Sequence, residues 1–362
     1  MNIPFVDLKA QYKSIKTEID KAIQNVINET AFIKGKYVQK FEEEYAREYG
    51  VKHVISCANG TDAIYIALKA LGIGDGDEVI TTALSWISTS ETISQSGASP
   101  VFVDIDSDYY TIDTSKIEEK ITEKTKAIIP VHLYGHSANM KNIMGLAKKY
   151  NLKVIEDCAQ AHFAQWQDKN VGTFGDFGTF SFFPGKNLGA YGDAGCLITN
   201  DDSLAEKSFM FANHGAKKKH HHDLEGINSR LDGLQAAILS VKLKYIHKWT
   251  DLRIQHAATY SELLSENCVE IPKTHQDAKH VFHLYVIRCK NRDDIQNNLK
   301  ENGISSGIHY PTALPYLKAY DYLGHSSKHF PLAFDFSTKI LSLPMFAELN
   351  VKKIRFITNK IN

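Results

Sequence analysis

The strongest chemical signal in this chain is a single lysine inside a glycine-rich segment. Lys186 follows a Pro-Gly pair, directly after the short apolar run 179–183. A long charged side chain is a poor choice for a tight, glycine-lined turn unless its amine has a chemical task. Asp157 ends another apolar run, 153–157, and lies 29 residues upstream of the lysine (186 − 157). The sequence therefore predicts an amine and a carboxylate at the ends of two buried strands.

An amine and a carboxylate placed in this way suit chemistry on pyridoxal phosphate. The amine of Lys186 can form a Schiff base with the aldehyde of that cofactor. The carboxylate of Asp157 can keep the pyridine nitrogen protonated, so that the ring accepts electrons. The amine needs a lowered pKa to react near neutral pH, which partial burial and a neighbouring cation would provide. Once displaced from the cofactor, Lys186 becomes the base for a 1,3-proton shift.

A strand-end Asp could instead belong to a P-loop nucleoside triphosphatase. That site requires the motif G-x-x-x-x-G-K-[ST]. Phe180 stands where the first glycine of the motif should be, and Asn187 follows Lys186. We therefore prefer the pyridinium role for Asp157 over the P-loop hypothesis.

A scaffold must hold these groups, and seven short apolar runs indicate its strands: 53–57, 79–82, 101–104, 127–131, 153–157, 179–182 and 196–199. Helical patterns separate most of them: 62–71, 86–96, 113–122 and 140–149. Short apolar runs with intervening helices predict an α/β fold, with a mostly parallel sheet and helices on both faces. The last two strands have no helix before them, which leaves room for an antiparallel strand.

Gly60 and Thr61 stand where such a sheet gathers its ligands, after strand 53–57 and at the start of a helix. Backbone N–H groups at a helix start, together with a hydroxyl, suit a phosphate. The alternative is that Thr61 simply caps the helix. Together with Lys186, the phosphate interpretation is preferred.

Five motifs, each weak alone, occur in an order that gives the chain a resemblance to a known family. They are Ala58-Asn-Gly-Thr-Asp-Ala63, Gly74-Asp-Gly-Asp-Glu-Val-Ile80, Glu156-Asp-Cys-Ala-Gln160, Phe182-Phe-Pro-Gly-Lys-Asn-Leu188 and Asn228-Ser-Arg-Leu-Asp232. The chain resembles the DegT/DnrJ/EryC1/StrS sugar aminotransferases over most of its length. The resemblance implies a fold-type-I enzyme of pyridoxal 5'-phosphate, with a seven-stranded, mostly parallel sheet flanked by helices and a smaller C-terminal α/β domain.

The resemblance also implies roles for residues around the cofactor. The ring of Trp86 would stack on the pyridine, although most tryptophans are core residues. Gln160 would hydrogen-bond near the phenolic oxygen. Ser181 would be a second phosphate ligand, unless its hydroxyl only satisfies the strand backbone.

Four further residues are similar to family positions that reach the substrate or the partner subunit. Asn228 would reach the cofactor phosphate of the other subunit, which makes a homodimer with shared active sites. Arg230 would hold the carboxylate of the amino donor or the sugar diphosphate, or else form an interface salt bridge. His309 and Tyr310 would line the sugar site, or else pack within the small domain.

The activity that the resemblance implies is transamination in two half-reactions. In the first, L-glutamate gives up its amine and leaves as 2-oxoglutarate. In the second, a nucleotide-linked keto sugar takes the amine. Family dehydratases carry a histidine at the position of Lys186, so the lysine favours an aminotransferase. The sequence around Lys186 and at Gly307-Ile-His-Tyr-Pro311 most resembles that of family members that aminate C3 of a dTDP-3-keto-6-deoxyhexose. Amination at C4 of a UDP- or GDP-sugar is the alternative. The product would enter a surface polysaccharide such as an O-antigen, or a glycosylated natural product.

A hypothesis from a different class is a non-catalytic regulator that binds pyridoxal phosphate. The intact set of Lys186, Asp157 and Gln160 speaks against it.

Bulk composition limits the partners and the location. The 42 Lys and Arg residues balance the 42 Asp and Glu residues, so charge gives no case for nucleic acid or an anionic membrane. No apolar run approaches the roughly 20 residues of a membrane span, and no signal peptide is evident. The five cysteines are scattered and lack a CxxC pair, which suits buried free thiols and gives no structural zinc site. We expect a cytoplasmic protein without a metal.

The chain length predicts two cores. We expect an N-terminal arm and helix at 1–30, a large cofactor-binding domain at 31–249, and a small domain at 250–362. One long helix from Leu231 to about Leu264 would connect the two domains. The biased run 217–223, Lys-Lys-Lys-His-His-His-Asp, is a solvated, mobile loop or, less favoured, a metal site.

Overall fold

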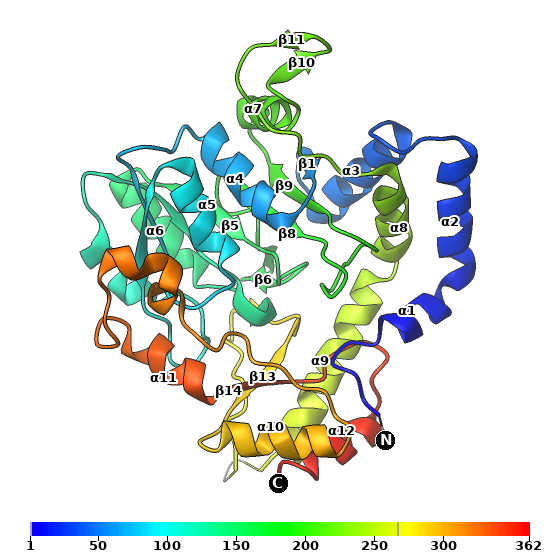
Figure 1. Ribbon diagram of the computed structural model, residues 1–362, viewed down its shortest axis with the longest axis vertical. Helices are drawn as coiled ribbons and strands as arrows, with labels where there is room; N and C mark the ends of the chain where they lie inside the picture. The colour runs from blue at the N-terminus through cyan, green and yellow to red at the C-terminus, as the bar shows by residue number, and fades with distance from the viewer. Residues whose placement is uncertain (1, 266–267) are drawn as a thin grey trace.

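The computed structural model describes residues 2–265 and 268–362 and is built around a seven-stranded sheet (Figure 1). Its strands, in the spatial order β1-β9-β8-β5-β4-β2-β3, are β1 (His53–Cys57), β9 (Gly195–Thr199), β8 (Phe177–Ser181), β5 (Lys153–Asp157), β4 (Thr125–Ile129), β2 (Glu78–Thr82) and β3 (Ser99–Val103). Strand β9 runs antiparallel to β1 and β8, and the other neighbours are parallel. The predicted mostly parallel sheet is confirmed, and its antiparallel member is one of the last two strands.

The helices of the described residues cover both faces of this sheet and build the C-terminal part. They are α1 (Leu8–Ser14), α2 (Lys16–Asn28), α3 (Lys36–Tyr49), α4 (Gly60–Ala70), α5 (Ser88–Ser96), α6 (Met140–Tyr150), α7 (Asp202–Ala212), α8 (Gly233–Leu243), α9 (Ile246–Leu263), α10 (Arg292–Glu301), α11 (Pro331–Lys339) and α12 (Val351–Thr358). Alternation along a strand sends neighbouring side chains to opposite faces. Val79 accordingly packs with α4 and α5 on one face, and Ile80 packs with α6 on the other.

Smaller elements complete the chain. Strands β6 (Gln165–Trp166), β7 (Lys169–Asn170) and β12 (Ala278–Lys279) form a three-stranded sheet, while β13 (Tyr285–Arg288) pairs with β14 (Ile340–Leu343). Strands β10 (Ala216–Lys218) and β11 (His221–His222) form a hairpin that projects from the body (Figure 1). The 3-10 turns are η1 (Thr114–Lys116), η2 (Glu118–Lys120), η3 (Leu133–Gly135), η4 (Leu314–Tyr316) and η5 (Lys318–Leu323).

The C-terminal part packs against both the N-terminal segment and the large sheet. Ile3 bridges to Ile304 in parallel and lies in the core that Tyr260 and Leu341 share. A second core joins Leu84, next to β2, with side chains of the C-terminal part. The chain thus brings residues beyond 280 to the end of the sheet where β2 and β5 finish. The three predicted domains remain a prediction.

Three predicted helices are wrong in detail. The helix at 113–122 is two 3-10 turns, because Ile117 is fully buried but Ile121 is not, so a longer helix would have no apolar stripe to bury. The long helix at 231–264 is two helices, α8 and α9. The break between them lets Lys244 and Tyr245 both contact the Glu18 carboxylate of α2. The N-terminal helix is likewise divided, into α1 and α2. The run 217–223 is exposed throughout, as predicted for a solvated loop, although part of it forms the β10–β11 hairpin.

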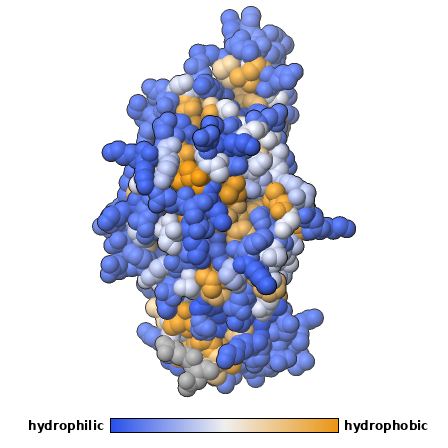
Figure 2. Space-filling view, turned by 90° about the vertical axis from the view of Figure 1, so that its left-hand side faces the viewer, coloured by the Kyte–Doolittle hydropathy of each residue, from blue (hydrophilic) through white to orange (hydrophobic). Residues whose placement is uncertain are grey.

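The surface is mostly polar on the face that Figure 2 shows, and the cysteines are mostly buried, as in an ordinary globular protein. One face of the molecule is largely hydrophilic, with hydrophobic patches toward its middle (Figure 2). All five cysteines are free and all but Cys268 are buried, as expected for thiols in apolar strands. Within the described residues, no helix has the length and apolar character needed to cross a membrane.

Candidate active site

Lys186 lies in the tightly held segment that follows β8. Its backbone N–H donates to Phe183 O (2.9 Å), which closes a turn. The next residue, Asn187, is buried and donates from its side chain to Val281 O (3.1 Å). Farther along, the buried Lys242 of α8 donates to Gly189 O (2.6 Å). The glycine-rich segment is therefore fixed from two sides, and the lysine it carries has a defined position.

The surroundings of Lys186 favour the reactive, unprotonated amine. The side chain is half-buried, and burial lowers its pKa to about 8, although the charge of Asp157 opposes this shift. The pKa of His309 is lowered to about 4, first by burial and then by the charge of Lys186. The amine therefore sits near both the carboxylate of β5 and a histidine from the C-terminal part.

Asp157 is buried at the carboxyl end of β5 and is oriented by two hydrogen bonds. Oδ2 accepts from the Thr89 hydroxyl of α5 (2.7 Å), and Oδ1 accepts from the Ala159 N–H (3.1 Å). The Ser85 hydroxyl lies 3.0 Å from that of Thr89 and extends the chain of hydrogen bonds. Such a network fixes the direction of the carboxylate, which a charge partner for a ring nitrogen requires.

The start of α4 and the end of β8 form a second corner of the site. A Cβ on Gly60 would lie 2.7 Å from Ser181 Cβ, so only glycine allows this approach. Asn59, not Thr61, caps the helix, since its Oδ1 accepts from Asp62 N (2.8 Å). The Thr61 hydroxyl instead lies 2.7 Å from that of Ser88. Free helix N–H groups and several hydroxyls therefore meet at one point, which suits a phosphate.

The Ser181 hydroxyl is only weakly engaged. Its oxygen accepts from the Phe183 N–H at 3.3 Å, a long hydrogen bond, and its proton remains available for an acceptor.

Trp86, Gln160 and Tyr310 come together from three distant parts of the chain. The ring of Trp86 is 58% exposed, so it is not a core aromatic, and its centroid lies 5.7 Å from that of Tyr310. Gln160 donates from Nε2 to the Tyr310 hydroxyl (3.0 Å) and accepts at Oε1 from Tyr134 N (2.7 Å). This buried amide thus ties the loop after β4 to the C-terminal part.

His309 is held by contacts on three sides. The Tyr134 hydroxyl donates to its carbonyl oxygen. Its Nδ1 lies 2.8 Å from the Ser342 hydroxyl, and the ring of Phe5 stacks on it at 5.5 Å. The N-terminal arm and β14 therefore position this histidine beside Lys186.

Asn228 and Arg230 are not brought into this group within one chain. Asn228 is exposed and forms an isolated antiparallel bridge with Asn213. The residue between them, Ser229, is buried and accepts from Ala58 N (3.0 Å) while donating to Asp62 (2.6 Å). Their segment is thus anchored near the start of α4, and among the described residues no hydrogen bond or ion pair links either side chain to Lys186 or Asp157.

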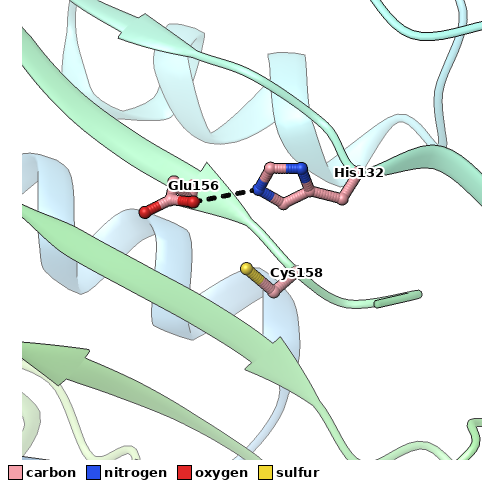
Figure 3. A group of neighbouring side chains, drawn as sticks. All are labelled: His132, Glu156 and Cys158. Atoms are coloured by element: carbon pink, nitrogen blue, oxygen red, sulfur yellow. Dashed lines mark hydrogen bonds and ion pairs between the residues drawn. The ribbon is translucent and has the colours of Figure 1, made fainter. Parts of the chain in front are cut away.

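One buried group among the described residues has metal-ligand chemistry. A ring nitrogen of His132, a carboxylate oxygen of Glu156 and the Sγ of Cys158 lie within 4.8 Å of one another (Figure 3). The Glu156 carboxylate, however, accepts from His132 Nε2 (3.1 Å) and from three backbone N–H groups in the segment 172–175. The other nitrogen of His132, Nδ1, accepts from Ala138 N (3.0 Å). All donors and acceptors of this pair are committed, so the group is a structural network that holds the segment 172–175 against β5.

Sequence reasoning missed three contributors to the site. Thr89 orients Asp157, Ser88 faces Thr61, and Tyr134 contacts both Gln160 and His309. The only available signal was the density of hydroxyls in Ser88-Thr-Ser-Glu-Thr92, which is unusual for a helix that is buried.

The profile of the DegT/DnrJ/EryC1/StrS aminotransferase family matches residues 13–362. The chain belongs to this family. It is 48% identical to a "pleiotropic regulatory protein" of Geobacillus stearothermophilus, over 100% of this chain and 98% of the relative. It is 43% identical to dTDP-3-amino-3,6-dideoxy-alpha-D-galactopyranose transaminase of Aneurinibacillus thermoaerophilus, over 99% of both. The crystal structure of S. venezuelae DesV with a ketimine intermediate superposes with a TM-score of 0.97 at 36% identity, over 99% of this chain and 97% of DesV.

Members of this aminotransferase family depend on pyridoxal phosphate, and the residues of this chain fit that group. A primary amine of lowered pKa, a buried oriented carboxylate, a largely exposed indole ring and a hydroxyl-rich helix start are gathered around one point. Lys186 can hold the aldehyde carbon, Asp157 the ring nitrogen, and the start of α4 the phosphate. The chain is thus a pyridoxal-phosphate-dependent sugar aminotransferase of the DegT/DnrJ/EryC1/StrS family.

Proposed function

We propose that this aminotransferase moves the amino group of L-glutamate to C3 of a nucleotide-linked 3-keto-6-deoxyhexose, with dTDP as the preferred nucleotide. The observation that supports the chemistry best is Lys186, a half-buried amine whose pKa is lowered to about 8 and which lies near Asp157 and His309. The preference for C3 and dTDP rests on the sequence of the motifs around Lys186 and at 307–311, and on the similarity to the relative from A. thermoaerophilus. The product would supply a surface polysaccharide such as an O-antigen.

Each residue has a proposed task in this reaction. The cofactor, when bound, supplies an electron sink for the carbon that carries the amine. Lys186 would take a proton from that carbon and return it to the carbon two bonds away, on the other side of the nitrogen, which its lowered pKa permits near neutral pH. Asp157, oriented by Thr89, stabilises positive charge at the ring nitrogen. Trp86 would cover one face of the ring, and Gln160 would hydrogen-bond near the phenolic oxygen.

The sugar and the second subunit complete the proposal. His309 and Tyr310 would line the sugar site, because His309 lies beside the lysine and Tyr310 contacts Gln160. Asn228 of the partner subunit would bind the cofactor phosphate, which is consistent with its exposure in a single chain. Arg230 would hold an anionic group of a substrate. This arrangement makes the homodimer the active form, and we place it in the cytoplasm.

The proposal is tested by two-substrate kinetics with purified holoenzyme, L-glutamate and a panel of keto sugars linked to dTDP, UDP and GDP. Transfer in two half-reactions gives parallel double-reciprocal lines. Turnover with dTDP-3-keto sugars that exceeds turnover with 4-keto sugars would support the substrate assignment. Intersecting lines would overturn the mechanism of two half-reactions. A preference for a 4-keto UDP- or GDP-sugar would overturn the substrate assignment. Relatives named for UDP- and GDP-sugars make this comparison necessary.

A second candidate is a regulator, because the relative from G. stearothermophilus carries that name. The same panel separates the two ideas. A regulator would retain the cofactor yet turn over no keto sugar, whereas the proposed enzyme turns over at least one.

A further inference from the structure

The segment that follows α2 and the segment that precedes α8 each carry a cationic residue, Lys34 and Arg230, and an antiparallel bridge holds the two segments together. The Gly233 N–H donates to Phe32 O (2.7 Å), and Ile33 bridges antiparallel to Asp232. Continued by one residue, this antiparallel register places Lys34 opposite Leu231, the chain neighbour of Arg230. The side chains of Lys34 and Arg230 are both half-buried. The backbone of Lys34 also has a φ of +55°, a left-handed conformation that a residue with a long side chain rarely adopts.

Within residues 2–265 and 268–362, neither cation has an acidic partner. Lys34 donates to Asn213 Oδ1 (2.5 Å) and lies over the ring of Phe209 at 5.2 Å, but these contacts leave its charge uncompensated. No ion pair or hydrogen bond of the Arg230 side chain occurs among the described residues. Burial, and then the charge of Arg230, lowers the pKa of Lys34.

Within the described part of the chain, Glu42 is the one acid whose charge acts on Lys34, and its carboxylate is already hydrogen-bonded to Ser56. Glu42 raises the pKa of Lys34 only as the smallest contribution. Its Oε1 accepts from the Ser56 backbone N–H (3.0 Å) and from the Ser56 hydroxyl (2.6 Å). The protein therefore keeps two partly desolvated like charges together, which costs stability unless an anion joins them. Locally unfavourable arrangements of this kind are typical of binding sites.

We propose that Lys34 and Arg230 form a two-cation site for an oxyanion of a substrate, with Lys34 as a specificity-determining residue. This inference rests on the proposed function and deepens it. The site is next to the predicted phosphate ligand Asn228, because Lys34 binds Asn213 and Asn213 bridges to Asn228. The oxyanion is either the carboxylate of the amino donor or the diphosphate of the sugar nucleotide. A guanidinium fork with an added ammonium suits both.

The test compares wild-type holoenzyme with Lys34→Met, which keeps the stem but removes the charge, and with Lys34→Arg, which keeps the charge. Lys36→Met is the matched control, because Lys36 is exposed in the same segment and pairs with Glu29 (2.6 Å). The first readout is the thermal midpoint with and without millimolar inorganic sulfate. An anion that binds the folded state raises this midpoint. The second readout is the KM for L-glutamate and, separately, for the keto sugar nucleotide.

The site predicts that sulfate stabilises the wild type, Lys34→Arg and Lys36→Met, but stabilises Lys34→Met clearly less. Without sulfate, Lys34→Met should be at least as stable as the wild type, because a repulsion is removed. Loss of one charge-assisted hydrogen bond should raise the KM of one substrate about ten-fold while kcat changes little. The substrate affected identifies the source of the oxyanion.

Equal stabilisation of Lys34→Met and wild type by sulfate would overturn the site. So would a Lys34→Met variant that is less stable or fails to fold, since this would mean a structural role. If wild type transfers no amine at all, the proposed function fails, yet the sulfate readout still decides whether the oxyanion site exists.

Discussion

At the scale of residues, the reactivity of Lys186 is set by competition between burial and the charge of Asp157. Burial lowers the pKa of the amine to about 8, and Asp157 raises it. The ordinary lysine value is 10.5, so the amine is unprotonated in a useful fraction of molecules near neutral pH. The balance gives a pH dependence with a definite sign.

We predict that the rate at which the cofactor-free protein takes up pyridoxal phosphate increases with pH and levels off above about 8. The amine attacks only when unprotonated, so the rate follows its deprotonation. In Asp157→Asn the midpoint should move to lower pH, because the charge that raised the lysine pKa is gone. Stopped-flow absorbance measures this rate. A midpoint near the ordinary lysine value, or a shift upward in the variant, would contradict the assignment.

The hydroxyl of Thr89 should matter through Asp157. Thr89→Val removes the 2.7 Å hydrogen bond to the carboxylate with little change in volume. We expect kcat to fall at least about ten-fold, the scale of one hydrogen bond to a charged group, while the cofactor stays bound. Thr92→Val is the control, because this hydroxyl is equally buried in α5 but binds Ser88 O (2.8 Å). Equal loss in both variants would point to general damage to the helix.

Which residues could be found from sequence depended on how local their signal is. Lys186 and Asp157 follow apolar strands, and ligands gather at such strand ends. Thr89 lies within a helical pattern, and nothing local shows that its hydroxyl faces a carboxylate 68 residues away. Lys34 looks like any surface lysine until the bridge between Ile33 and Asp232 brings its segment against the one that carries Arg230.

At the scale of elements, the strands were predictable because apolar runs bounded by turns are local patterns. The helices were less so. The helical period continues from Leu231 to Leu264, but α8 ends at Leu243 and α9 begins at Ile246. At the break, Lys244 and Tyr245 both donate to Glu18 of α2, a partner that is distant in sequence and that a local pattern does not reveal.

The helix α8 also supports the segment that carries Lys186, through the fully buried side chain of Lys242. Lys242 donates to Gly189 O, and burial lowers its pKa to about 7, with Glu348 opposing the shift. The folded state therefore binds fewer protons than the unfolded state between pH 7 and the ordinary value of 10.5. Stability contributed by this group is reduced at low pH and recovers as pH rises through that window.

Lys242→Met should remove this pH dependence. The free energy of unfolding of the wild type should rise more steeply from pH 7 to pH 9 than that of the variant, because only the wild type releases the Lys242 proton on folding. Urea unfolding at each pH measures both slopes. Lys244→Met, at an exposed lysine that pairs with Glu18 (3.3 Å), should keep the wild-type slope. Identical slopes in Lys242→Met and wild type would show that the buried lysine does not titrate as argued.

At the scale of the whole molecule, the site depends on chain segments that only the complete fold assembles. His309 and Tyr310 come from the C-terminal part, and Phe5 of the N-terminal arm stacks on His309. Among the described residues, Asn228 and Arg230 make no hydrogen bond or ion pair to Lys186 within one chain. In the proposed homodimer, a second copy of the chain would bring them to the cofactor.

Shared active sites predict complementation between inactive variants. Lys186→Ala and Asn228→Ala should each lose activity as separate homodimers. Subunits that exchange at random give half heterodimers, and each heterodimer has one intact site, so the mixture should recover about a quarter of wild-type activity. The assay is turnover after partial unfolding and refolding of the mixture. Activity no higher than that of the separate variants would show that each site uses one chain only.

The measurement that tests the central claim most directly is the absorption spectrum of the purified protein beside Lys186→Ala, before and after addition of L-glutamate. We predict a visible band in the wild type that glutamate removes and that an acceptor keto acid restores. In Lys186→Ala, glutamate should produce no such cycle, because the amine that binds the cofactor and moves the proton is missing. A wild type without a visible band, even after pyridoxal phosphate is added, would contradict the account of Lys186 and of the reaction built on it.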